Sequence, residues 1–200
     1  MNVVPFVDEG LGNTSWFVDL GDGRAMVVDA GRDPRPYLAE AERRKVELAL
    51  AAETHLHADF ITGNRELGAL GVDILAPDKS DLTWPHRSLH PGDELDLGGL
   101  VLRVLATPGH TPEHLAYLLL DGSRPVAVFT GGSLLVGAVA RTDLIDREAT
   151  EELSRPCGAR STTSCSHCPT RWSSIRPTVP ARSARPRPAI GAGRPSGPSG

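Results

Sequence analysis

The chain has 200 residues, enough for one domain, or for one domain with an appendage. Hydrophobic residues make up 40% of it and aromatic residues 4%, which suits a globular core built from Leu, Val and Ala. A net charge of −4 argues against nucleic-acid and anionic-membrane partners. The first ten residues include acids and no basic residue, and the longest apolar stretch, 126–140, is too short to span a bilayer. We therefore expect a cytoplasmic protein.

The composition changes abruptly near Arg155. Residues 1–155 carry 14 basic and 25 acidic side chains, a net charge of −11. Residues 156–200 carry 7 Arg, no acidic residue, all 3 cysteines and 8 of the 17 prolines. We therefore expect a domain at 1–155 and a separate kind of sequence, a tail, at 156–200.

Apolar periodicity and turn residues predict the elements of the domain in chain order. Strands are expected at 14–20 and 25–29 around a Gly-Asp-Gly turn, then a helix at 34–45, a buried strand at 46–52 and a helix at 62–71. Five more strands are expected at 73–76, 94–97, 101–106, 115–120 and 126–130. Strands outnumber helices, and a strand–helix–strand–helix unit lies among hairpins. This pattern predicts a layered α/β or α+β domain.

The segment 53–60 (ETHLHADF) follows the buried strand and alternates polar side chains. In extended backbone, His55, His57 and Asp59 project to the same side. Imidazole and carboxylate groups are good ligands for Zn or Fe, and a loop that leaves a buried strand holds them rigidly. A polar loop whose histidines hydrogen-bond to the backbone explains this short pattern equally well.

A second histidine site follows another apolar strand, in the segment 107–111 (TPGHT), whose Pro-Gly turn places His110 at a strand end. Two such sites in one domain favour a metal. The motifs ETHLHADF, ATPGHTPEH and FTGGSLLVGAVARTDL, preceded by VDAG at 28–31, resemble the successive motifs of the metallo-β-lactamase superfamily, above all its glyoxalase II and persulfide dioxygenase branch. The resemblance covers about 8–150 and implies an αβ/βα sandwich with metal in the cleft between the sheet edges.

The resemblance also implies roles for individual residues. His55, His57 and His110 match the three-histidine metal site of the family, and Asp59 matches the carboxylate of its second metal site. The family usually has a histidine directly after that aspartate, where this chain has Phe60. The expected cofactor is therefore one divalent metal ion, Zn or Fe.

A second departure from the family is Gly132, which stands where the family has the aspartate that bridges two metals. Persulfide dioxygenases of the family hold Fe(II) with two histidines, matched by His55 and His110, and with that aspartate. The three histidines that remain resemble a catalytic zinc site with an open fourth position. A metal there could activate water, which Asp59 could orient or deprotonate.

These residues lead to two hypotheses about function. The first is a metal-dependent enzyme of the glyoxalase II or persulfide dioxygenase type, which hydrolyses a thioester or oxidises a persulfide and whose partner is a thiol-derived small molecule. The second is a degenerate, non-catalytic protein of the same fold, truncated by a frameshift. The metal content of the protein discriminates between them.

Other polar features have simpler interpretations. His114 is expected to be structural, although it could also support the metal ligands or contact a substrate. His86 and His90 lie in a proline-rich loop and are expected to be solvated. The segment 131–133 is expected to be a tight turn rather than an anion-binding loop.

The tail at 156–200 has the composition of a disordered segment, and its arginines also suit a nucleic-acid-binding tail. A third interpretation fits better, namely translation out of frame. With a frame offset of two bases, 175–185 can encode PTHGAGSFCS, whose His-Gly resembles the final metal-ligand motif of the family. The preceding part, back to Pro156, can encode an amphipathic helix and then a strand. The domain is therefore expected to be incomplete at its C-terminal end.

Overall fold

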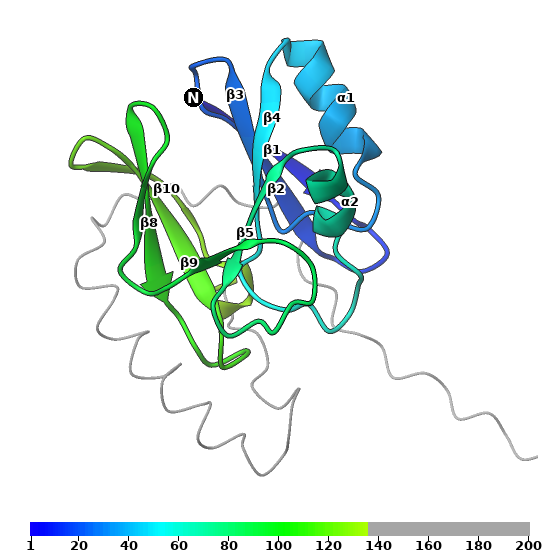
Figure 1. Cartoon of the computed structure of the whole chain (residues 1–200), viewed down its shortest axis with the longest axis vertical. Coiled ribbons are helices and arrows are strands. Elements are labelled where there is room, and N and C mark those ends of the chain that lie inside the picture. The colour runs from blue at the N-terminus through cyan, green and yellow to red at the C-terminus, as the bar shows by residue number, and fades with distance from the viewer. Residues whose placement is uncertain (136–200) are drawn as a thin grey trace, which may run out of the picture.

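The computed structural model describes residues 1–135, which form two β-sheets and two α-helices (Figure 1). The last part of the predicted domain, 136–155, and the tail, 156–200, lie outside the described residues. The first sheet has the order β1-β2-β3-β4-β5-β6, with strands at Asn2–Val7, Thr14–Asp19, Arg24–Val28, Glu47–Ala52, Asp73–Pro77 and Arg87–Leu89. The second has the order β10-β9-β8-β7, and β7 to β10 span Glu94–Asp96, Leu100–Ala106, Leu115–Asp121 and Arg124–Phe129.

The first sheet is antiparallel from β1 to β3 and parallel from β3 to β6. A tight hairpin joins β2 to β3, whereas α1 (Arg35–Arg44) and α2 (Asn64–Ala69) lie in the crossovers that make β3, β4 and β5 parallel. Both helices cover the same face of this sheet, away from the second sheet (Figure 1). Strand β4 reads ELALAA because both of its faces are covered.

The larger hydrophobic core lies between the two sheets. Alternate side chains of the second sheet point into it, as Leu102 and Val104 of β8 and Tyr117 of β9 do, and they pack against Met26 and Val28 of β3. A second core lies between the first sheet and the helices and includes Phe17, Val27, Tyr37, Ala41 and Leu67. These layers of helices, sheet and sheet fit the predicted αβ/βα sandwich over the described part of the chain.

Most predicted elements are confirmed within one or two residues at each end. The predicted helix at 34–45 is observed as Arg35–Arg44, and the one at 62–71 as Asn64–Ala69. The prediction omitted β1 and β6. Strand β1 contains Pro5 and forms a partly exposed edge, and β6 has only three residues, so neither shows a buried-strand pattern.

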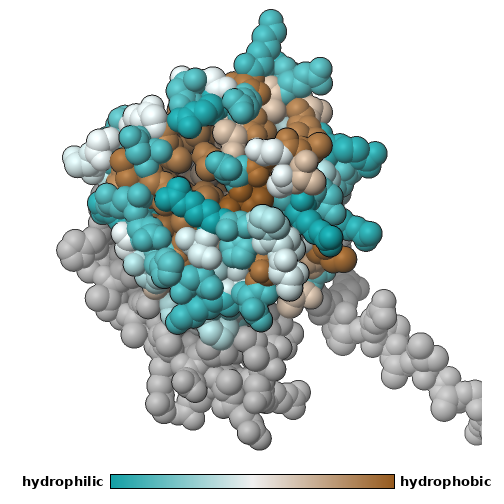
Figure 2. All heavy atoms as spheres, in the orientation of Figure 1, coloured by the Kyte–Doolittle hydropathy of each residue, from teal (hydrophilic) through white to brown (hydrophobic). Residues whose placement is uncertain are grey.

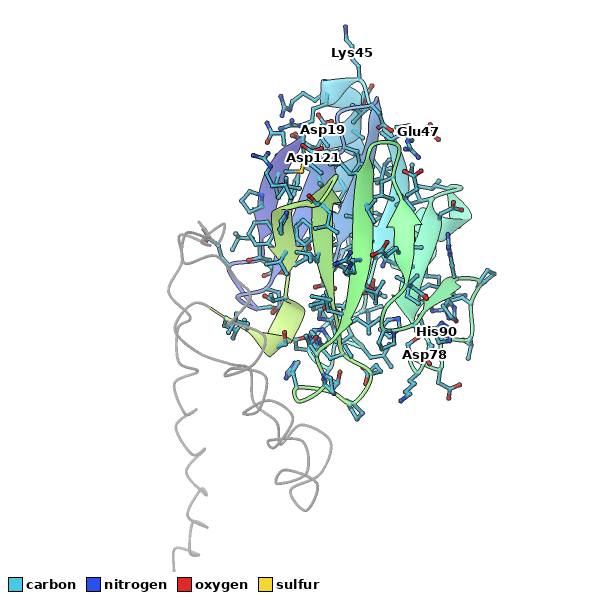
Figure 3. All side chains as sticks on the ribbon, turned by 90° about the vertical axis from the view of Figure 1, so that its left-hand side faces the viewer. Asp19, Lys45, Glu47, Asp78, His90 and Asp121 are labelled. Carbon is cyan, nitrogen blue, oxygen red and sulfur yellow. The ribbon has the colours of Figure 1, made fainter. Side chains whose placement is uncertain are left out.

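The two ends of the sandwich differ in chemistry. Figure 3 shows Asp19, Lys45, Glu47 and Asp121 at one end, where β4 begins and β9 ends. The opposite end holds the carboxyl ends of β3 and β4 and the start of β9, where the histidine motifs lie. Neither helix among residues 1–135 is long and apolar enough to cross a membrane.

Candidate metal centre

Asp29, directly after β3, anchors the segment that carries the first two histidines. It has the positive φ of 54° that aspartate tolerates better than most residues, and its N–H donates to the Ala52 carbonyl at 2.8 Å. Its carboxylate accepts hydrogen bonds from the Thr54 N–H at 2.7 Å and from the Thr54 hydroxyl at 2.9 Å. Although burial favours the neutral acid, contacts with His57, His55 and Thr54 hold the pKa of Asp29 below its usual value.

These hydrogen bonds fix which nitrogen of His55 is available. The single hydroxyl proton of Thr54 points to Asp29, so the contact of 2.8 Å between Thr54 Oγ1 and His55 Nδ1 requires Nδ1 to be the donor. Burial and the neighbouring His57 lower the pKa of His55 to about 2, which keeps the ring neutral. The lone pair of His55 therefore lies on Nε2, as a metal ligand requires.

His57 is oriented by two buried carboxyl groups. Its Nε2 lies 3.3 Å from Asp29 Oδ1 and 3.5 Å from Glu53 Oε2, as a charge contact rather than an aligned hydrogen bond. Burial alone would lower the pKa of His57, but the two carboxyl groups outweigh it and raise the pKa to about 10. With Nε2 turned toward the carboxyl groups, Nδ1 is the nitrogen at which a metal would take the place of the proton.

Asp29, Glu53 and His57 also form a group whose possible ligand atoms all lie within 4.8 Å of one another. Both Glu53 side-chain oxygens are buried without a hydrogen-bond partner among the described residues, and burial raises the pKa of this carboxyl group. The carboxylate of Asp29 is already used by Thr54. We therefore interpret this group as the support that orients His57 rather than as the metal site itself.

Two of the three histidines expected to bind metal, His57 and His110, each lie beside the third, His55. The centroid of the His55 ring lies 4.2 Å from that of His57 and 4.9 Å from that of His110. His110 belongs to the loop before β9, where Thr107 N–H donates to the His114 carbonyl and Gly109 N–H to the Thr111 carbonyl. Leu115 N–H then donates to the Thr54 carbonyl at 2.8 Å, which joins this loop to the first histidine segment.

His114 is the site residue that the sequence identified least well. It is 1% exposed, and its ring stacks on His55 with centroids 4.7 Å apart and an interplanar angle of 21°. Its Nε2 accepts a hydrogen bond from Gly132 N–H at 3.0 Å, and its Nδ1 lies 2.8 Å from Thr107 Oγ1. Both nitrogens are engaged, so His114 supports the site without being a ligand in this arrangement.

Asp59 and Phe60 lie differently from the three histidines. Asp59 is exposed, and its Oδ2 accepts a hydrogen bond from the Asn13 side-chain amide at 2.9 Å. The Phe60 ring packs on His57 with centroids 4.2 Å apart. An apolar ring thus lies beside His57 at the position where the resemblance to the family places a further metal ligand.

Gly132 and Gly131 are packed so closely that a side chain would collide. A Cβ atom on Gly132 would lie 2.4 Å from His110 Cδ2, so the His110 ring uses the space that a bridging aspartate would need. Gly131 has a φ of +48°, and a Cβ atom there would lie 2.3 Å from Thr54 Oγ1. Residues 131–133 form a 3₁₀ turn, which confirms the predicted tight turn.

The donor set at this end of the sandwich fits a borderline metal. The imidazole rings of His55, His57 and His110 lie together, and buried hydrogen-bond or charge partners orient the first two. Of the other three histidines of the described part, His114 stacks on His55, whereas His90 is 62% exposed and His86 contacts the Trp84 carbonyl. The expectation that His86 and His90 are both solvated is confirmed for His90, whereas His86 is half-buried.

Comparison with known proteins agrees with this geometry. The family model "Metallo-beta-lactamase superfamily" matches residues 8–186. "Hydroxyacylglutathione hydrolase" of Methylobacillus flagellatus is 40% identical over 98 residues, covering 48% of this chain and 39% of the relative. The human "Hydroxyacylglutathione hydrolase-like protein" is 37% identical over 116 residues, covering 56% of this chain and 39% of the relative. The chain thus spans about two fifths of the length of these relatives.

Solved structures give the same result. A metallo-beta-lactamase from Staphylococcus aureus subsp. aureus COL has a TM-score of 0.76 and 31% identity, and the match covers 84% of this chain and 53% of that one. ETHE1 from Myxococcus xanthus has a TM-score of 0.63 and 30% identity, covering 72% and 63%. The resemblance to the glyoxalase II and persulfide dioxygenase branch is confirmed by these relatives. The chain belongs to the metallo-beta-lactamase superfamily.

Proposed function

We propose that this chain is a metal-dependent enzyme that hydrolyses a thioester of a small thiol, with one divalent metal ion bound by His55, His57 and His110. The observation that carries the proposal is the convergence of these three rings, with His55 Nε2 and His57 Nδ1 left for a metal. Phe60 and Gly132 support one ion rather than two, because neither offers a ligand at its position.

The residues of the chain divide the work between binding and orientation. Thr54 and Asp29 hold the His55 ring in one tautomer, and Asp29 and Glu53 hold the His57 ring. A divalent metal ion bound there would supply Lewis acidity and an activated water. Asp59 lies on the same loop and is exposed, which makes it our candidate for orienting or deprotonating that water, once its carboxylate moves from Asn13 or uses its other oxygen.

The substrate class rests on the relatives. Those named hydroxyacylglutathione hydrolases act, by that name, on a thioester of glutathione, and they are 32–40% identical to this chain over the matched part. A thiol-derived small molecule is therefore the substrate class we propose. Because this chain spans half or less of those proteins, the acyl group is left to experiment.

Oxidation of a persulfide is the second candidate, and the 30% identity to ETHE1 favours it. It is the weaker candidate because the iron site of the persulfide dioxygenases uses a carboxylate at the position of Gly132. The purified chain should be loaded separately with Zn(II) and with Fe(II). We expect loss of a hydroxyacylglutathione thioester with Zn(II), and little oxygen uptake with glutathione persulfide and Fe(II).

The same experiment tests the proposal against a degenerate protein. Oxygen uptake with Fe(II) and no thioester loss would favour the second candidate. A chain that binds neither metal and turns over neither substrate would instead be the non-catalytic, truncated protein that the sequence also allows.

A further inference from the structure

The turn at Gly131–Ser133 lies against the histidine site through glycine backbone rather than through a side chain. A Cβ atom on Gly132 would lie 2.4 Å from the His110 ring, so bare backbone packs against that ring. Other hydrogen bonds of the turn are local: Ser133 N–H and Ser133 Oγ both donate to the Thr130 carbonyl, at 3.0 and 2.7 Å. Among the described residues, the bond that ties the turn to the histidine site runs from Gly132 N–H to His114 Nε2 at 3.0 Å.

The direction of that bond fixes the state of His114. A backbone N–H can only donate, so Nε2 must accept, and the proton of the neutral ring must lie on Nδ1. Nδ1 in turn faces Thr107 Oγ1 at 2.8 Å, where it finds an acceptor. The Gly132 N–H thus selects the tautomer of His114 with the proton on Nδ1, and Thr107 Oγ1 supports this tautomer by accepting that proton.

His114 also touches the metal site directly through its ring. It stacks on His55 at 4.7 Å between centroids, and the centroid of His110 lies 6.3 Å away. The side chain is 1% exposed and lies beneath these two rings, so it cannot be a solvated or substrate-facing residue in this arrangement. The buried ring of His114 therefore contacts His55, one of the expected ligands. Through Gly132 it also fixes the backbone that packs against His110, another expected ligand.

We infer that His114 is a positioning residue of the metal centre, which holds the Gly131–Ser133 turn against His110 and supports the ring of His55. This inference deepens the proposed function and rests on it. The hydrogen bond from Gly132 N–H to the His114 imidazole thus fixes this turn. The turn lies at the position where the family has a metal-binding carboxylate. Groups that orient ligands in this way typically affect metal affinity by about 10- to 100-fold.

Two variants of His114 separate its ring from its hydrogen bonds. His114→Phe keeps an aromatic ring for the stack on His55 but removes the acceptor for Gly132 N–H. His114→Gln keeps an acceptor at a similar reach and a donor. In the full-length chain, titration with Co(II) should show binding about 10- to 100-fold weaker for His114→Phe, with a changed visible spectrum, and only a few-fold weaker for His114→Gln.

Thr107 provides a test that leaves His114 in place. Thr107→Val removes the acceptor for Nδ1–H, and His114 can then shift its proton to Nε2 and lose the bond from Gly132. Thr107→Ser keeps the hydroxyl group and is the matched control. We expect weaker Co(II) binding for Thr107→Val and parental binding for Thr107→Ser, together with a shift of the Gly132 amide resonance in the valine variant. His90→Gln, at an exposed histidine, should bind as the parent does.

The results that overturn the inference are distinct from those that overturn the proposed function. A parent chain that binds no Co(II) removes both. If the parent binds Co(II) and His114→Phe binds it equally well, with the same spectrum, His114 is merely structural even where the melting temperature falls. Equal losses in His114→Gln and His114→Phe would likewise contradict a role for the acceptor. If His114→Phe does not fold, parental binding by Thr107→Val overturns the inference.

Discussion

Single residues explain why this site departs from the usual pattern of its family. The sequence alone indicated that Phe60 and Gly132 replace two metal ligands. The structure adds a physical reason for each, because Phe60 stacks on His57 and His110 fills the space above Gly132. Sequence reasoning did not identify the support given by Asp29 and Glu53, and it named support of the metal ligands only as an alternative for His114. Asp29 and His114 lie far from the first histidine segment in the chain, whereas Glu53 lies four residues before His57. The VDAG motif was a signal for Asp29.

The close packing at Gly132 changes what a substitution there should do. Restoring an aspartate cannot simply complete a second ligand set, because its Cβ atom would collide with His110. We expect even Gly132→Ala to displace His110, to lower stability by about 1–3 kcal/mol and to weaken metal binding. Thermal unfolding and Zn(II) competition would measure both effects. Gly10→Ala, where the added carbon meets only Asp8 Oδ1 at 3.2 Å, is the control. Parental metal affinity in Gly132→Ala would show that His110 is free to move away at no cost.

At the scale of elements, sequence periodicity predicted the helices and strands whose positions depend on residues close together in the chain. The helix α1 has Pro34 as its N-cap and Pro36 in its first turn, and its C-cap is Lys45, whose φ of 58° matches the left-handed conformation expected at a helix C-terminus. The buried strand β4 was equally clear from its apolar run. Strand β6 has three residues and pairs only through the parallel ladder with β5, so nothing in its own sequence marks it. The convergence of the two histidine loops also depends on how the sheets pack, which local patterns do not determine.

Helix α1 carries a charge cluster that makes a pH-dependent contribution to stability. Hydrogen bonds from Arg43 and Arg44, each at 2.6 Å to Glu40 Oε1, lower the pKa of Glu40 to about 2. Because this pKa is depressed below its unfolded value of about 4.5, the stabilisation is present above that pH and is lost as the pH falls toward 2. Arg43 is 65% exposed and Glu40 12% exposed, so solvent screening limits the contribution to about 0.5–1 kcal/mol.

Replacing Glu40 by Gln tests this contribution. We expect Glu40→Gln to unfold at lower denaturant concentration than the parent at pH 7, and the difference to shrink below pH 4 and to vanish near pH 2. Glu42→Gln, an exposed acid on the same helix, should show a smaller difference at pH 7. A difference for Glu40→Gln that stays constant from pH 7 to pH 2 would show that packing rather than charge is responsible.

At the scale of the whole molecule, the two sheets are covered unequally. Both described helices pack on the first sheet (Figure 1), and Figure 2 shows apolar side chains among the polar ones on the face it presents. In the second sheet, the side chains that alternate with the core-facing ones point to the other face. Leu105, Leu118 and Val128 lie on that face together with the charged Arg103. Within residues 1–135 no helix covers this face.

The reading frame near Arg155 offers a candidate cover for this face. The tail translated in the shifted frame can supply an amphipathic helix and a strand in the order this fold uses, followed by His-Gly. We propose a one-base insertion, deletion or sequencing error there.

A gene corrected at this point should give a protein with a higher melting temperature and soluble yield, because the apolar face is then covered. Resequencing checks the cause directly. An uninterrupted frame, with the same tail found by mass spectrometry, would rule out a sequencing error and leave a genuine frameshift, and a corrected chain no more stable than the parent would contradict the proposed cover.

The metal content of the purified chain and of its ligand variants tests the central claim most directly. Elemental analysis should find about one Zn or Fe per parent chain and almost none in His55→Ala or His110→Ala, because each variant leaves two protein ligands. Glu53→Gln, which alters the buried support of His57 but leaves all three histidines, should keep most of the metal. Histidine variants as fully loaded as the parent would contradict the account. So would loss of metal from Glu53→Gln with retention in His110→Ala, since that result would assign the metal to the group of Asp29, Glu53 and His57.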